Sequence, residues 1–391
     1  MQAVRQSVDA MQADGGDVVV VGAGLIGLAI AFELAERGAS VRIYDRGEPA
    51  RAASWAGAGM LAPYTERITN EPLLALCAAS LAEYPAFVRR VFDASGVDAH
   101  LHLDGVIYAA FDEPQLDSLE RHAYILRARG VECEMLDRAS ALAAEPWLGA
   151  GLTGALLKRG EGYVDNRRLG RALAAACAAR GVRVEENSAV SVECDARRII
   201  GIRVERGFVP ARSVINACGA WAASVAGVPR SSVAPVEPVK GQMVALAVPA
   251  GFVRRATWVP GAYLVPRHDG RLLIGATVEA AGFDERVTAS AVHELLHAAL
   301  GAAPALADFA VTESWTGLRP GTPDGLPFLG PTSVEGLFLA TGHYRNGILL
   351  APATARLIAD AVATGNASEL EPFSIARLGT EAAPAGRSIR A

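Results

Sequence analysis

DVVVVGAGLIGLAIAFELAERGASVRIYD, residues 17–45, contains a strand, a glycine turn, a helix and a second strand in immediate succession. A β-branched apolar run enters Gly22, and Gly22, Gly24 and Gly27 are spaced as G-x-G-x-x-G. An apolar helical pattern continues to Gly38, and the second strand ends at Asp45. Glycines in this context are typical of a dinucleotide-binding unit.

Each residue type in this unit has a physical reason. Gly22 allows the tight turn, Gly24 lets the backbone approach a pyrophosphate, and Gly27 lets helix and strand pack closely. The free N–H groups at the helix start face the phosphates. Asp45 follows about twenty residues later and is expected to accept hydrogen bonds from ribose hydroxyls. These residues alone leave open which dinucleotide is bound.

Length and composition limit the class of protein. With 391 residues, 51% hydrophobic residues and 20% charged residues, the chain is long enough for two domains with sizeable cores. The formal net charge is -5 and no long basic run is present, which makes nucleic acid an unexpected partner.

Targeting and redox signals point to the cytoplasm. The longest apolar run, Val18–Phe32, contains three glycines and is shorter than the ~20 residues of a membrane helix. Residues 1–16 lack an apolar core and are expected to form a flexible extension rather than a signal peptide. The five cysteines are scattered without C-x-x-C spacing, so we expect neither a disulfide framework nor a metal site.

The order of the predicted elements indicates two interleaved domains of an α/β fold that is α+β overall. Alternating segments with Asp-Gly turns, such as 101–110 and 262–278, predict antiparallel strands outside the nucleotide unit. We expect a Rossmann-type nucleotide domain from 17–75, 151–225 and 318–372, and a discontinuous antiparallel-sheet substrate domain from 76–150 and 226–317. Residues 373–391 are expected to be a flexible tail.

Two further segments suggest which dinucleotide binds. Residues 54–61 read SWAGAGML, and their small side chains leave room for a large flat group. A flavin has a use for such a surface and an NAD enzyme has none here, although the segment could simply start a helix. Near the C-terminus, a strand enters the glycine turn at 342–347, and a helix is expected over 348–362, beginning at Asn346 or Gly347.

These segments together resemble the D-amino-acid oxidase family of flavoproteins, and within it the glycine oxidase branch that serves thiamine biosynthesis. The resemblance extends in consistent order from about residue 18 to 363. Besides the N-terminal unit, it rests on Ala58-Gly-Met, Val239-Lys-Gly, Tyr263-Leu-Val-Pro-Arg, Gly275-Ala-Thr, Gly317-Leu-Arg-Pro-Gly-Thr and Gly342-His-Tyr-Arg-Asn-Gly-Ile-Leu-Leu-Ala-Pro-Ala-Thr.

The resemblance implies FAD, bound without a covalent link because no cysteine follows Cys218. A helix start at Asn346 or Gly347 would offer backbone N–H donors and a positive dipole end to the negative charge of reduced flavin. Beside the three glycines, the implied cofactor-binding residues are Leu25, Ile26, Asp45, Arg46, Ala52, Ala53, Ala58, Gly59, Met60, Val190, His343, Tyr344, Arg345, Asn346, Gly347, Ile348 and Leu349.

Substrate recognition is expected to depend on Arg319, whose planar guanidinium matches an α-carboxylate. The resemblance adds Tyr263 and Arg345 to the pocket. Each of the three has another reading: an interdomain ion pair for the arginines and a core aromatic for Tyr263. Val278 replaces the methionine of the glycine oxidase pattern, and this predicts a roomier pocket.

The implied reaction is oxidative deamination of glycine, sarcosine or a small D-amino acid. The Cα hydrogen would leave as a hydride to flavin N5 without a side-chain acid or base, giving an imino acid or glyoxylate, ammonia and hydrogen peroxide. A D-amino-acid dehydrogenase that reduces a quinone remains an alternative, as does an NAD(P)-binding dehydrogenase or nucleotide sensor. The resemblance also implies a homotetramer and molecular oxygen as co-substrate.

Overall fold

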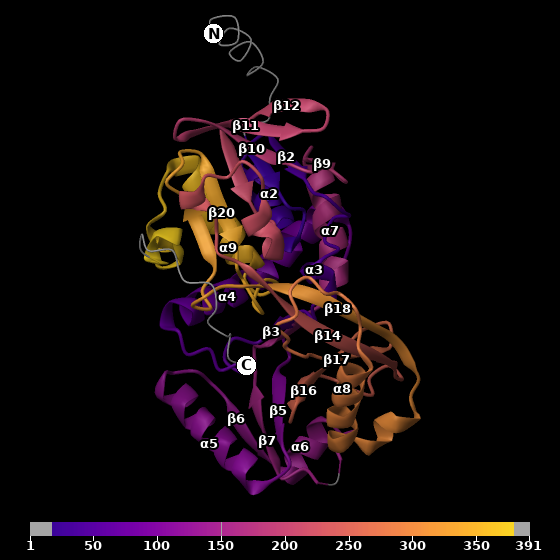
Figure 1. Cartoon of the computed structure of the whole chain (residues 1–391). Helices are drawn as coiled ribbons and strands as arrows, with labels where there is room; N and C mark the ends of the chain where they lie inside the picture. Colours follow the sequence, from indigo (N-terminus) through magenta and orange to yellow (C-terminus); the bar gives the residue numbers. More distant parts are fainter. Residues whose placement is uncertain (1–17, 150, 379–391) are drawn as a thin grey trace, which may run out of the picture.

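The computed structural model describes residues 18–149 and 151–378, and they form a mixed α/β fold built around two large sheets (Figure 1). One sheet lies in the upper half of Figure 1 and the other in the lower half, with β3, α3 and α4 between them. The predicted fold class is confirmed.

The first sheet contains the nucleotide-binding unit. Its strand order is β19-β20-β13-β1-β2-β9, and its pairings are parallel except that β19 runs antiparallel to β20. The strands are β1 (Val18–Val21), β2 (Val41–Tyr44), β9 (Arg183–Glu185), β13 (Ser213–Asn216), β19 (Phe328–Pro331) and β20 (Leu337–Thr341).

Both faces of this sheet are covered. Alternate side chains of β1 point to opposite sides, so each side of the strand packs against a different layer. Val18 and Val20 pack among the helices of one face, whereas Val19 and Val21 pack against a three-stranded antiparallel sheet. The helices are α2 (Leu25–Glu36), α4 (Glu71–Ser95), α7 (Asn166–Ala179) and α9 (Ala351–Thr364), and the strands are β10 (Ser191–Asp195), β11 (Arg198–Val204) and β12 (Gly207–Pro210).

The second large sheet has eight strands in the order β18-β14-β17-β16-β15-β5-β7-β6. It is antiparallel apart from the parallel pair β15 and β5. The strands are β5 (Val106–Ala110), β6 (Glu134–Asp137), β7 (Gly154–Lys158), β14 (Glu237–Ala247), β15 (Ala256–Val259), β16 (Ala262–Pro266), β17 (Arg271–Gly275) and β18 (Val311–Gly321).

Helices cover the outer side of this sheet and leave part of its inner side facing the nucleotide-binding unit. That inner part carries Met243, Trp315 and Tyr263 in one apolar cluster with Ala56 and Ala58. The helices on the outer side are α6 (Arg138–Ala144) and α8 (Ala289–Ala302), whereas α5 (Glu113–Ala128) packs on the inner side of β5 and β7.

Short elements complete the fold. A small sheet of β3 (Met60–Leu61), β8 (Gly162–Val164) and β4 (Leu101–His102) joins the two halves beside α3 (Ala53–Ala56). The 3₁₀ helices are η1 (Gly219–Ser224), η2 (Arg230–Ser232), η3 (Pro304–Asp308), η4 (Ser368–Phe373) and η5 (Ile375–Leu378).

The helix boundaries follow from local chemistry. The Asn70 side chain accepts the Leu73 N–H at 3.1 Å and starts α4, and Gly96 with φ of 69° ends it. Asp165 caps α7 in the same way by accepting the Arg168 N–H at 3.0 Å. By contrast, Gly24 precedes α2 and provides no capping side chain.

The distribution of elements differs from the predicted domain ranges in two places, and the ranges themselves stay a prediction. β7, predicted with the nucleotide domain, pairs with β5 and β6 in the eight-stranded sheet. Much of α4, predicted with the substrate domain, packs on α7 and α9. In both cases contacts between segments far apart in the sequence place the element, and the local sequence pattern does not encode such contacts.

The predicted flexible tail starts too early. Phe373 is buried, and Arg377 donates to both carboxylate oxygens of Asp324 at 2.7 and 3.0 Å. The fold therefore continues through residue 378. The predicted extension 1–16 and residues 379–391 lie outside the described residues.

All five cysteines are free thiols. Within the described parts of the chain, no helix combines the length and apolar character needed to cross a bilayer.

Candidate functional site: a cavity between the two large sheets

A cavity of about 850 Å³ lies between the nucleotide-binding unit and the inner side of the eight-stranded sheet. Val21, Tyr44 and Ala340 reach it at or near the carboxyl ends of β1, β2 and β20, respectively, which is where open α/β sheets bind their ligands. Gly241 and Gly317, from β14 and β18, form part of the opposite wall.

The glycine turn opens directly onto this cavity. Gly22 has φ of 109°, and a Cβ on Gly27 would overlap the carbonyl oxygen of Gly22. Both glycines are therefore required for α2 to start so close to β1. Gly22 and Gly24 line the cavity, and Gly27 supports them from behind without lining it. The N-terminal turn of α2 thus faces the cavity as a site for phosphate groups.

Asp45 and Arg46 lie at the end of β2, as predicted for a ribose-binding position. Asp45 accepts the Ala23 N–H at 2.6 Å and the Gly47 N–H at 2.8 Å, so it also holds the glycine turn in place. The Arg46 guanidinium lies 4.0 Å from the ring centre of Trp221, whose other neighbour is Phe283 at 5.6 Å. Val190 lines the same end of the cavity.

The small residues at 52–60 form a flat wall. Gly57 faces Ile348, and a Cβ there would come within 2.7 Å of the Ile348 side chain. Gly59 has φ of 73°, and a Cβ would overlap the carbonyl oxygen of Val164. Larger side chains are thus excluded and the backbone itself borders the cavity. The predicted residues Ala52, Ala53, Ala58, Gly59 and Met60 all line it.

The turn between β20 and α9 supplies hydrogen-bond donors to the cavity. Gly347 and Ile348 line it, and the backbone N–H groups of Gly347, Ile348 and Leu349 form no hydrogen bond with any other described residue. The predicted helix start is wrong, because α9 begins at Ala351, but one turn closed by Leu350 N–H to Asn346 O at 2.8 Å precedes it.

The other residues predicted in this turn divide into two groups. His343, Tyr344 and Arg345 line the cavity, whereas Asn346 and Leu349 do not. His343 is buried with its Nε2 3.1 Å from Thr354 Oγ1, and burial lowers its pKa to about 3. Its imidazole is consequently neutral and is held by α9.

Arg319 reaches the cavity from β18 in a fixed orientation. Its Nη1 donates to the carbonyl oxygens of Lys240 at 3.3 Å and Thr277 at 3.1 Å. The guanidinium lies over Gly241, where a Cβ would overlap it. Lys240 itself is buried and its ammonium lies 3.8 Å from Glu279 and 3.7 Å from Asp284.

Tyr263 and Arg345 share the cavity with Arg319, but Val278 does not line it. Burial raises the pKa of the Tyr263 hydroxyl, and the charges of Arg319 and Arg345 oppose that rise. Since Val278 lies outside the lining residues, the structure brings together three of the four predicted substrate-binding residues. The inference of a roomier pocket from Val278 has no structural support.

Sequence reasoning missed several lining residues, among them Glu66, Trp221 and Trp258. Glu66 lies on the loop after β3, and Trp258 lies on β15 beside Tyr263. The Trp258 indole N–H is buried without a hydrogen-bond partner among the described residues. No motif surrounds these residues in the sequence, and the one signal for Trp258 is its position opposite Tyr263 in the hairpin of β15 and β16.

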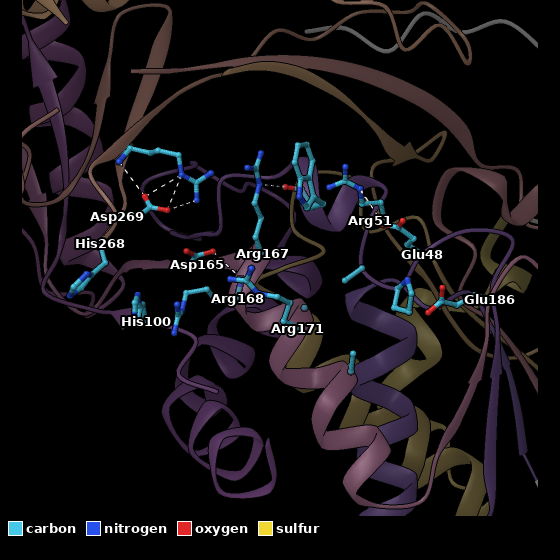
Figure 2. Close-up of a pocket in the computed structure, with 16 residues that line it drawn as sticks. Glu48, Arg51, His100, Asp165, Arg167, Arg168, Arg171, Glu186, His268 and Asp269 are labelled. Carbon is cyan, nitrogen blue, oxygen red and sulfur yellow. Dashed lines mark hydrogen bonds and ion pairs between the residues drawn. The ribbon is translucent and has the colours of Figure 1, made fainter. Parts of the chain in front are cut away.

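A second cavity of about 780 Å³ adjoins the first at Arg51 and Trp55 (Figure 2). Two of the arginines that line it are paired with carboxylates. Arg167 donates to both carboxylate oxygens of Glu313 at 2.9 and 3.0 Å, and Arg271 lies 2.8 Å from Asp269. Neither Gly22 nor Gly24 lines this second cavity.

The residues of the first cavity fit FAD. The glycine turn and α2 suit a pyrophosphate, Asp45 suits a ribose, and the flat wall at 56–59 faces a turn with three unpaired N–H groups. Cys218 also lines this cavity, and burial raises its thiol pKa to about 12. The thiol is therefore protonated and a poor nucleophile.

Comparison with known proteins agrees with this assignment. A family model described as FAD dependent oxidoreductase (DAO) matches residues 17–361. A glycine oxidase of Pseudomonas aeruginosa is 38% identical over 376 residues, covering 95% of this chain and 99% of that protein. A glycine oxidase of Geobacillus kaustophilus is 40% identical over 366 residues, covering 92% of this chain and 97% of that protein.

Two further matches complete the comparison. The crystal structure of glycine oxidase from Geobacillus kaustophilus superposes with a TM-score of 0.86 at 39% identity, covering 93% of this chain and 98% of that one. The bifunctional protein ThiO/ThiG of Synechocystis is 38% identical over 96% of this chain, which spans 56% of that protein. The predicted resemblance and FAD are confirmed: the chain belongs to the FAD-dependent oxidoreductase family of D-amino-acid oxidases.

Proposed function

We propose that this protein oxidises the CH–NH₂ group of glycine, and also accepts sarcosine or small D-amino acids. The products are an imino acid that water hydrolyses to glyoxylate or its equivalent, ammonia, and hydrogen peroxide from molecular oxygen. The observation that carries the proposal is the fixed guanidinium of Arg319 in the cavity that fits FAD.

Arg319 supplies the carboxylate anchor. Its Nη1 donates to two backbone carbonyls, the Tyr263 hydroxyl lies beside the guanidinium, and we expect the remaining N–H groups to bind a substrate carboxylate. A short amino acid held there by its carboxylate places its Cα within the cavity rather than at its mouth. FAD, when bound, accepts two electrons and a hydrogen from that carbon.

The chain's contribution to the rate is positioning rather than acid or base catalysis. His343, the histidine that lines the cavity among the described residues, is neutral and hydrogen-bonded to Thr354. Arg319, Tyr263 and Arg345 orient the substrate, and the unpaired N–H groups of residues 347–349 favour negative charge on the cofactor.

The relatives support the choice of substrate and suggest a metabolic role. Proteins named glycine oxidase match nearly the whole chain, and the fused ThiO/ThiG relative supports a role in thiamine biosynthesis.

The direct test is peroxide release by the flavin-loaded protein with glycine, sarcosine and D-alanine, compared with Arg319→Ala. Loss of one partner of a buried charge pair costs about 2–5 kcal/mol, so kcat/KM should fall about 30- to 1000-fold or more. Arg286→Ala is the matched control, since Arg286 is 86% exposed and pairs with Asp284 outside the lining residues.

Three results contradict parts of the proposal. Unchanged activity in Arg319→Ala removes the carboxylate anchor. Substrate that reduces the flavin anaerobically without any peroxide in air shows a dehydrogenase that uses another acceptor, such as a quinone. No oxidation of any of the three amines overturns the proposed function.

A further inference from the structure

A carboxylate without a partner lies in the substrate half of the cavity. Glu66 lines the cavity together with Tyr263, Arg319 and Arg345. Its side chain forms no hydrogen bond or ion pair within the described residues, although the charges of Arg345 and Arg319 act on it and lower its pKa against the larger raising effect of burial. The Glu66 side chain is half-buried, and a carboxylate in such a position that is not directly paired favours a cationic partner.

The other acidic residues lining the cavity are engaged or exposed elsewhere. Asp45 holds the glycine turn, and Glu48 lies 3.7 Å from Arg51 at the nucleotide end. Glu285 is exposed on the loop between β17 and α8. Among the described acids that line the cavity, Glu66 is the one associated with the two arginines of the substrate half.

The loop that carries Glu66 is held firmly. The Glu66 N–H donates to Ala62 O at 3.0 Å, and the preceding N–H groups of Tyr64 and Thr65 donate to Glu161 at 2.6 and 3.2 Å. Glu161 is completely buried, and the Thr65 hydroxyl donates to its second oxygen. Glu66 therefore faces the cavity from a fixed backbone rather than from a loose surface loop.

We propose that Glu66 binds the ammonium group of the amino-acid substrate while Arg319 binds its carboxylate. The inference rests on the proposed function and adds a second anchor to it. An amino acid in solution carries one group of each sign, and the cavity offers a carboxylate and a guanidinium to match them. The site thereby distinguishes an amino acid from a hydroxy acid of the same size.

The test compares glycine with glycolate, which has a hydroxyl group in place of the ammonium group. Both are measured on the flavin-loaded protein: glycine by kcat/KM, and glycolate by the dissociation constant from the change in flavin absorbance. Hydrogen bonds to charged groups contribute about 1.5–3 kcal/mol, so Glu66→Gln should lower kcat/KM for glycine about 10- to 100-fold.

The same variant should bind glycolate as tightly as the wild type or more tightly, because it removes a negative charge near the hydroxy acid. Glu66→Asp keeps the charge and should recover part of the glycine activity. Glu120→Gln, at an exposed position of α5 outside the lining residues, is the matched control, and both its glycine activity and its glycolate binding should equal those of the wild type.

Two results overturn the inference. Glycine activity in Glu66→Gln within twofold of the wild type shows that Glu66 does not bind the ammonium group. An equal loss of glycine activity and glycolate binding shows that Glu66 merely positions the arginines. If the wild-type protein oxidises no amine, the proposed function fails together with this inference. If the wild type is active and Glu66→Gln has the same kcat/KM for glycine, this inference alone fails.

Discussion

Gly241 has no side chain, and this leaves room for the Arg319 guanidinium. A Cβ at this position would overlap the Arg319 guanidinium. We expect Gly241→Ala to displace that group and to lower kcat/KM for glycine about 10- to 100-fold, since a shift of about 1 Å in a substrate-positioning group can cost 100-fold. FAD absorbance should remain. Gly301→Ala is the control because open space surrounds Gly301. Equal activity of the two variants would contradict the expectation.

Glu161 makes stability depend on pH. Burial raises its pKa from 4.5 to about 7, so the folded protein retains a proton that the unfolded chain has already lost. The resulting stabilisation is complete below pH 4.5 and is lost as the pH rises through 7. Glu161→Gln cannot titrate at this position. From pH 5 to pH 8, the wild-type free energy of unfolding should therefore fall relative to the variant by about 2–3 kcal/mol.

Urea denaturation of both proteins at the two pH values checks this difference. A constant difference between wild type and Glu161→Gln would show that Glu161 is ionised in the folded protein throughout the range. The result bears on the site because Glu161 accepts the N–H groups of the loop that carries Glu66.

A serine of α4, Ser80, holds the turn between β20 and α9 in its conformation. The Ser80 hydroxyl donates to Leu349 O at 2.6 Å and accepts the Ala353 N–H at 3.2 Å, entirely within the core. Ser80→Ala leaves both backbone groups without that partner, at a cost of about 1–3 kcal/mol. We expect weaker FAD binding, measured by titrating the apoprotein with FAD. Ser95→Ala, at the end of α4, should not affect it.

The elements that could be predicted from sequence are those with local signals. The β1–α2–β2 unit could be predicted from its glycine spacing and hydrophobic pattern. The start of α9 could not be read correctly, because residues 347–350 form a turn in which the N–H groups of Gly347, Ile348 and Leu349 have no hydrogen-bond partner among the described residues. β7 falls in a range predicted for the nucleotide domain but pairs with β5 and β6, because long-range pairing rather than local pattern selects its neighbours.

Across the whole molecule, the nucleotide half of the site was predictable and the opposite wall was only partly so. The residues from 22 to 60 lie along one stretch of chain and carry a recognisable pattern. Arg319 was found because its motif is distinctive. Glu66 and Trp258 have no such motif, and the assembled fold brings them to the same cavity from the loop after β3 and from β15.

The most direct test of the account is the visible absorbance of the purified protein before and after glycine is added without oxygen. Because one cavity contains both the FAD-binding surfaces and the Arg319 anchor, we predict a flavin spectrum that glycine bleaches and that air restores with release of peroxide. An intact flavin spectrum that glycine, sarcosine and D-alanine all leave unchanged would contradict the account.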